Sequence, residues 1–133
     1  MPRLFEQWAM LLLLGACQRT TALPPIPAPP VVSPQDLQRG ADVFATHCVR
    51  CHGVQGWGDG PVGGKRVRVQ DLGDVLWQSN ASNERIAAAI LRGGRGVRKS
   101  PEMPAFAQFA QDRALLDGLV AYIRSLARTQ TQF

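Results

Sequence analysis

One short stretch of the sequence combines residue types at a spacing that could do chemistry, Cys48-Val49-Arg50-Cys51-His52. In a helix, two cysteines three positions apart lie about one turn apart, so each sulfur could bond to one of the two vinyl groups of a haem. The histidine after the second cysteine would then supply a nitrogen ligand to the iron. The stretch therefore predicts one haem c attached covalently through Cys48 and Cys51, with His52 as an axial ligand.

Three other uses of these residues fit the sequence less well. A structural zinc site normally takes two well-separated pairs of ligands, whereas the candidates here, from His47 to His52, are crowded into one short stretch. A thioredoxin-like redox pair belongs in a βαβ setting, of which the sequence gives no sign. A disulfide between Cys48 and Cys51 would leave His52 without a role.

Met103 is the expected second axial ligand, because no other methionine lies outside the first sixteen residues. It lies in a polar loop between Pro101 and Pro104, where a methionine is not needed to fill a core. The only other histidine, His47, precedes Cys48 on the same helix and would lie on the proximal side of the haem. A lysine would have to lose its proton before it could bind iron. The sequence therefore favours a histidine–methionine iron site.

Helices are expected to position these residues. Ser33 followed by Pro34 is typical of a helix start, and the apolar residues that follow recur on one helical face as far as Cys48. A loop rich in glycine follows, over residues 53–64.

Two further helices are expected in the second half of the chain. The first covers residues 84–91, with Asn80 or Ser82 as its cap, and is stopped by Gly93-Gly94. The second covers residues 112–128 and carries an apolar stripe at helical spacing. The sequence thus predicts one small all-α domain over residues 34–133.

The first residues have the pattern of an export signal. Residues 8–16 form an unbroken apolar run that is too short to span a bilayer, and the run ends in Leu14-Gly15-Ala16-Cys17. This ending resembles the lipobox of bacterial lipoprotein signals. It predicts a signal peptide over residues 1–16 and a lipidated Cys17 that anchors the protein on the periplasmic side of a membrane. Gln18, in place of aspartate, slightly favours the outer membrane. An ordinary signal peptide with a free Cys17, or an uncleaved short anchor, remain alternatives.

Residues 17–33 are expected to connect the anchor to the domain. This segment contains five prolines, a density that excludes a helix or a sheet strand and predicts extended, polyproline-like chain. We therefore interpret it as a tether.

Several further elements resemble the bacterial class I cytochrome c family over most of the domain. They are the Cys48–His52 motif, Gly58-Asp59-Gly60-Pro61, Asp71-Leu72, Trp77, Ile90 with Gly93, and Met103-Pro104-Ala105-Phe106. The resemblance implies the cytochrome c fold, a small helical domain wrapped around one haem. It also implies a close crossing of the first and last helices at Gly40, Phe44 and Tyr122, and a hydrogen bond from His52 Nδ1 to Pro61. The sequence departs from the family at Val69-Gln70, where a proline is common.

The haem environment can be predicted in part. Apolar walls are expected from Phe44, Leu72, Trp77, Ile86, Ile90 and Phe106. Trp77 and the basic residues before the ligand loop, Arg95 among them, are candidates to contact the haem propionates, because buried carboxylates need donors or cations. The alternative is a core tryptophan and solvated arginines.

These features together indicate an electron carrier. The formal net charge is +5, but no basic-aromatic module for nucleic acid is present. Because His52 and Met103 would saturate the iron, we expect neither a small-molecule substrate nor an enzyme activity, but one-electron exchange with a redox protein donor and acceptor. Two alternatives remain: a haem subunit or dedicated donor of a larger oxidoreductase, and a ligand-binding sensor or enzyme in which Met103 dissociates.

Overall fold

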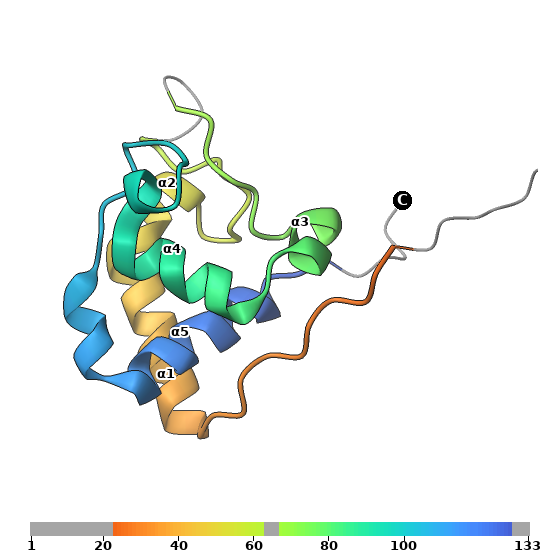
Figure 1. Cartoon of the computed structure of the whole chain (residues 1–133), viewed down its shortest axis with the longest axis vertical. Helices are drawn as coiled ribbons and strands as arrows, with labels where there is room; N and C mark the ends of the chain where they lie inside the picture. The colour runs from red at the N-terminus through yellow and green to blue at the C-terminus, as the bar shows by residue number, and fades with distance from the viewer. Residues whose placement is uncertain (1–22, 63–66, 129–133) are drawn as a thin grey trace, which may run out of the picture.

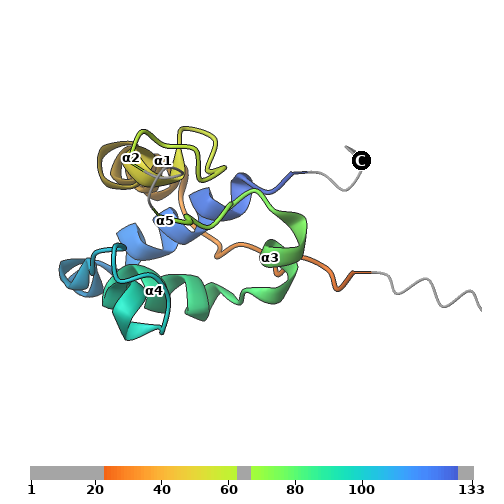
Figure 2. The same cartoon turned by 90° about the horizontal axis from the view of Figure 1, so that it is seen from above.

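The computed structural model describes residues 23–62 and 67–128, and all regular structure within these ranges is helical. The all-α prediction is therefore confirmed. Figure 1 shows α1 and α5 crossing each other, and the view from above in Figure 2 shows α5 between α1 and α4. In chain order the elements are α1 (Pro34–Val43), the π-helical turn η1 (Phe44–Cys48), α2 (Val49–His52), α3 (Val75–Asn80), α4 (Asn83–Gly96), the 3-10 turn η2 (Ala107–Gln111) and α5 (Arg113–Ser125).

The N-terminal helical segment begins where the sequence indicates. The Ser33 side chain accepts a hydrogen bond from the backbone N–H of Asp36 at 3.1 Å, and Pro34 occupies the first turn. The segment runs as far as His52, but not as one regular α-helix, because Phe44–Cys48 form a π turn. Such turns are rare and often lie at functional sites. Here the turn leads directly into the Cys48–His52 motif.

The crossing of α1 and α5 depends on two glycines rather than one. A Cβ atom at Gly40 would clash with the backbone of Gly118, and a Cβ atom at Gly118 would clash with the carbonyl oxygen of Asp36. Beside this contact the rings of Phe44 and Tyr122 lie 5.2 Å apart between centroids. The crossing implied by the family resemblance is present, and Gly118 is the partner that the sequence did not reveal.

The later helices begin within one residue of their predicted starts. Ser82 caps α4 by accepting from the N–H of Arg85 at 3.2 Å, and the helical pattern breaks at Gly93, where φ is 65°. Asp112 caps α5, which ends at Ser125, three residues before the predicted end. The short helix α3, capped by Asp74, was not predicted.

The core lies between α1, α4 and α5. Phe44, Leu119 and Val120 are at most 1% exposed at its centre. Of the six expected wall residues, Phe44, Leu72, Ile86 and Ile90 are buried in this cluster, whereas Trp77 and Phe106 are partly buried and pack against it.

The described part of the proline-rich segment is extended, as predicted, but it is not free of the domain. Residues 26–32 line a groove on one side, and Leu37, Ala121, Arg124 and Ser125 line it on the other. Asn83, the first residue of α4, donates from Nδ2 to the carbonyl oxygen of Ala28 at 2.8 Å. We call residues 26–32 the strap. Figure 1 shows it running from beside α3 to the start of α1.

Two sequence predictions concern residues 1–22, which lie outside the described ranges: the signal peptide and the lipidated Cys17. In the described ranges, no helix has both the length and the apolar character needed to cross a bilayer.

Candidate functional site

His52 ends α2, and a backbone carbonyl from a later loop fixes its ring. Its Nδ1 lies 3.1 Å from the carbonyl oxygen of Gln70. Because a carbonyl can only accept, Nδ1 carries the proton and donates it. Burial lowers the pKa of His52, so that the ring is neutral at pH 7. The lone pair on Nε2 is therefore available to a metal.

The acceptor for Nδ1 differs from the one that the family resemblance implied. After α2 the chain folds back along that helix, where the N–H of Val62 donates to the carbonyl of Arg50 at 2.9 Å. This path leaves Pro61 exposed. The carbonyl of Gln70 takes its place, at the position where the sequence departs from the family.

Cys48 and Cys51 both carry free, half-buried thiols on successive turns of the segment that ends at His52. Cys48 packs against the hydrophobic core. Its burial, with a smaller contribution from Cys51, raises the pKa of the Cys48 thiol to about 11, so that this thiol is protonated at neutral pH. Cys48 thus lies on the face of this segment that packs against the core.

Met103 lies on a loop that is built onto the end of α4. Its carbonyl oxygen accepts from the N–H of Gly94 at 3.0 Å, and the N–H of Phe106 donates to the carbonyl of Ile90 at 2.9 Å. The side chain of Met103 is half-buried. Hydrogen bonds at Met103 and at Phe106 therefore fix the backbone of this loop to α4.

Gly93 and Gly94 allow this loop to approach α4, a role beyond the helix stop that their sequence position predicts. A Cβ atom at Gly93 would lie 2.8 Å from the carbonyl oxygen of Met103, and one at Gly94 would clash with the carbonyl of Ser100. A glycine pair ten residues before a candidate ligand is a signal that could have indicated the contact.

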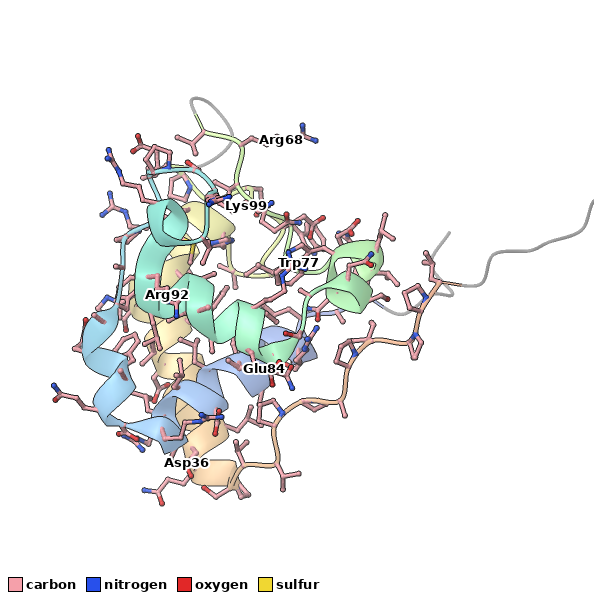
Figure 3. The ribbon with its side chains drawn as sticks, in the orientation of Figure 1. Asp36, Arg68, Trp77, Glu84, Arg92 and Lys99 are labelled. Carbon is pink, nitrogen blue, oxygen red and sulfur yellow. The ribbon has the colours of Figure 1, made fainter. Side chains whose placement is uncertain are left out.

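The other sequence-predicted residues take different positions. Trp77 is half-buried against the core, and Figure 3 shows it on the side of α3 nearest α4. Arg95 is exposed near the end of α4, as are Arg92 on that helix and Lys99 on the turn after it. The contacts of Trp77 and Arg95 with propionates stay predictions.

His47 is exposed, and its ring packs beside the aromatic rings that follow the Met103 loop. Its centroid lies 5.6 Å from that of Phe106 and 6.3 Å from that of Phe109. The π turn that carries Cys48 and the segment after Met103 are therefore in direct contact. Across residues 23–62 and 67–128, no three His, Cys, Asp or Glu side chains are grouped so that they could hold a metal ion.

Comparison with known proteins identifies the domain. Residues 35–123 match the family described as cytochrome c oxidase, cbb3-type, subunit III. The chain belongs to this family of c-type cytochromes.

Two kinds of relatives accompany this match. The cytochrome is 29% identical over 101 residues to the cytochrome bc1 complex cytochrome c subunit of Corynebacterium diphtheriae, across 76% of this chain and 31% of the relative. It thus spans about a third of that protein. Among solved structures, the c-type cytochrome KustC0563 is 26% identical with a TM-score of 0.48, covering 67% of this chain and 98% of its own. A quinohemoprotein alcohol dehydrogenase, ADHIIG of Pseudomonas putida HK5, is 26% identical with a TM-score of 0.47, covering 78% of this chain and 13% of its own.

A cytochrome of this family carries covalently bound haem c, and the residues present fit that group. Two free thiols stand three positions apart, and a neutral histidine with a fixed tautomer follows them directly. Apolar residues of the core lie beside Cys48. This is the donor set that thioether attachment and imidazole ligation of haem require.

Proposed function

We propose that the cytochrome is a one-electron carrier whose haem iron is ligated by His52 and Met103. The observation that carries the proposal is the hydrogen bond from His52 Nδ1 to the Gln70 carbonyl, which leaves Nε2 free to bind. When bound, the haem supplies a one-electron change between ferric and ferrous iron. The partners of the cytochrome would be a redox protein that donates the electron and one that accepts it.

The chain's own residues contribute orientation and rigidity. Gln70 holds the His52 ring in one tautomer, and the contacts of the Met103 loop with Gly94 and Ile90 hold the second ligand on α4. Since both ligands would be attached to helices, little of the protein has to move when an electron arrives or leaves. A histidine–methionine pair also raises the reduction potential.

The optical spectrum tests whether Met103 is a ligand of the iron. The oxidised wild-type protein should show the sulfur-to-iron band of methionine ligation and bind added imidazole poorly, because no position on the iron is open. Met103→Ala should lose the band and bind imidazole readily. Lys99→Ala, which removes a lysine four residues before Met103, should behave as wild type. A wild-type protein that lacks the band and binds imidazole readily would instead support the ligand-binding sensor or enzyme.

A second function is favoured by what the relatives are called. The matched family is described as an oxidase subunit, and the Corynebacterium diphtheriae relative as a bc1 complex subunit. The domain could therefore serve as the haem subunit or dedicated donor of a larger oxidoreductase. Mild solubilisation of native membranes followed by native electrophoresis separates the two functions. A shuttle migrates alone, whereas a subunit migrates with its complex.

We also propose a location on the periplasmic side of a bacterial membrane, held by lipid on Cys17 and with the outer membrane slightly favoured. The support is the Leu14-Gly15-Ala16-Cys17 ending of the apolar run. Two or more acyl chains hold a protein durably where one does not. Mass spectrometry of the protein from its native membrane should find an acylated N-terminal Cys17. An unmodified Cys17, or retention of residues 1–16, would remove the anchor.

A further inference from the structure

The loop over residues 70–73 supplies the carbonyl that holds His52, and contacts with Arg128 and Gln78 fix this loop on two sides. On one side Arg128 Nη2 lies 2.7 Å from Asp71 Oδ2. The other carboxylate oxygen of Asp71 accepts from the N–H of Gly73 at 2.9 Å, and the N–H of Arg128 donates to the carbonyl of Gly73 at 3.1 Å. Arg128 thus holds the loop by both its side chain and its backbone.

On the other side a buried amide holds Leu72. Gln78, on α3, is 0% exposed, and its Nε2 donates to the carbonyl of Leu72 at 2.7 Å and to that of Ile123 at 3.0 Å. Its Oε1 accepts from Arg124 Nη1 at 2.7 Å. A fully buried amide whose donors and acceptor are all used has one low-energy orientation, so Leu72 is held rigidly.

These contacts converge on the backbone next to Gln70. Asp71 and Leu72 are the two residues that follow Gln70, and the N–H of Leu72 also donates to the carbonyl of Gly56 at 2.7 Å. A carbonyl whose two following residues are fixed cannot move away from the imidazole independently. The length of the bond to His52 Nδ1 is therefore set by residues that do not touch His52.

We propose that Arg128 and Gln78 are positioning residues for His52, and that through the loop over residues 70–73 they set the strength of its Nδ1 hydrogen bond and so tune the reduction potential of the haem. The inference rests on the proposed ligation by His52. A hydrogen bond from Nδ1 to a carbonyl makes the imidazole a stronger electron donor. A stronger donor favours ferric iron, so loosening the loop should raise the potential.

The sign of this effect separates it from simple electrostatics. Arg128→Gln removes one positive charge, and losing a cation by itself stabilises ferric iron and lowers the potential. A looser Nδ1 bond acts in the opposite direction. Arg113→Gln is the charge control, because Arg113 also forms an ion pair of 2.7 Å, with Asp117, at the other end of α5. Arg128→Lys keeps a cation opposite Asp71 and should restore the wild-type behaviour.

The test uses the holoprotein, with proton exchange at His52 Nδ1 followed by NMR in the ferrous state and the potential measured by titration. Arg128→Gln should exchange this proton about threefold to tenfold faster, the factor that corresponds to losing one ordinary hydrogen bond. Its potential should rise, whereas Arg113→Gln should leave the exchange rate unchanged and not raise the potential. Gln78→Glu keeps an acceptor for Arg124 but has no donor for Leu72, and should also speed the exchange.

Equal exchange rates and potentials in Arg128→Gln and Arg113→Gln would overturn the inference. Failure of the underlying ligation is distinguishable, because wild-type holoprotein would then show no spectral sign of histidine bound to iron. If Gln78→Glu does not fold, the comparison of Arg128→Gln with Arg113→Gln decides alone. Arg128 is partly exposed, so its substitution should leave the protein folded.

Discussion

Single residues in this cytochrome are held in conformations that only the surrounding contacts explain. Gly93 has a φ of 65°, and a Cβ atom there would lie 2.8 Å from the carbonyl oxygen of Met103 and 2.8 Å from the backbone nitrogen of Ala105. A side chain there would be strained by its backbone angle and would also push the Met103 loop away from α4. The position of the proposed iron ligand therefore depends on the absence of one methyl group.

Gly93→Ala should lower the free energy of unfolding by about 1–3 kcal/mol and weaken the sulfur-to-iron band, because the Met103 loop is displaced. Denaturant unfolding and the oxidised spectrum measure the two effects. Ala89→Gly, on the same helix, is the control. It should cost about 1 kcal/mol through helix propensity and leave the band intact. If Gly93→Ala keeps a wild-type band, the close approach at Gly93 does not position Met103.

At the scale of elements, the sequence predicts what local signals determine. The caps at Ser33 and Ser82 and the apolar stripes are read within one helix, so the starts of the long helices were predicted closely. The π turn, the strap contacts and the Gln70 carbonyl beside His52 depend on packing between distant segments. The short helix α3 was not predicted because it lacks a long apolar stripe. The cysteines, His52 and Met103 are recognisable from spacing, whereas the groups that orient them are not.

The hydrogen bond from Asn83 to the strap can be tested by measuring how mobile the strap is. Asn83→Asp keeps the oxygen that accepts from Arg124 but loses the Nδ2 donor to Ala28. Backbone 15N relaxation of the ferrous protein should show order parameters near 0.85 for strap residues in the wild type, falling toward 0.6 in the variant. Asn80→Asp is the matched control, because the Asn80 amide bonds to Leu76 and not to the strap. Wild-type strap residues with order parameters below 0.6 would mean that the strap is not docked.

At the scale of the whole molecule, charge is distributed unevenly. Arg92, Arg95, Arg98 and Lys99 are exposed, and within the described ranges none of them forms an ion pair. We call these four residues the basic turn. Arg98 even keeps a φ of 57°, which glycine would adopt with less strain. In both views the described chain begins beside α3, while the basic turn lies at the opposite end of the molecule.

Removing three of the four charges of the basic turn should change the rates of electron exchange with small charged reagents. In Arg95→Gln/Arg98→Gly/Lys99→Gln, oxidation by anionic hexacyanoferrate should slow and oxidation by a cationic cobalt complex should speed up. The difference should shrink as the Debye length falls from about 10 Å at 0.1 M salt to about 3 Å at 1 M. Neutralising Arg39, Arg85 and Arg113 instead makes the same change of net charge elsewhere. Equal effects of the two triple variants would show that the basic turn does not steer partners.

Contacts of the strap, Arg124 and Arg128 show that the folded domain is longer than the family match. The family match covers residues 35–123, yet Ala28, Arg124 and Arg128 outside it make contacts that fix α4, Gln78 and Asp71. A module cut at the borders of sequence similarity would lose all three. For grafting onto another protein, or for exchange between relatives, the transferable unit of this cytochrome therefore needs to include residues 26–128.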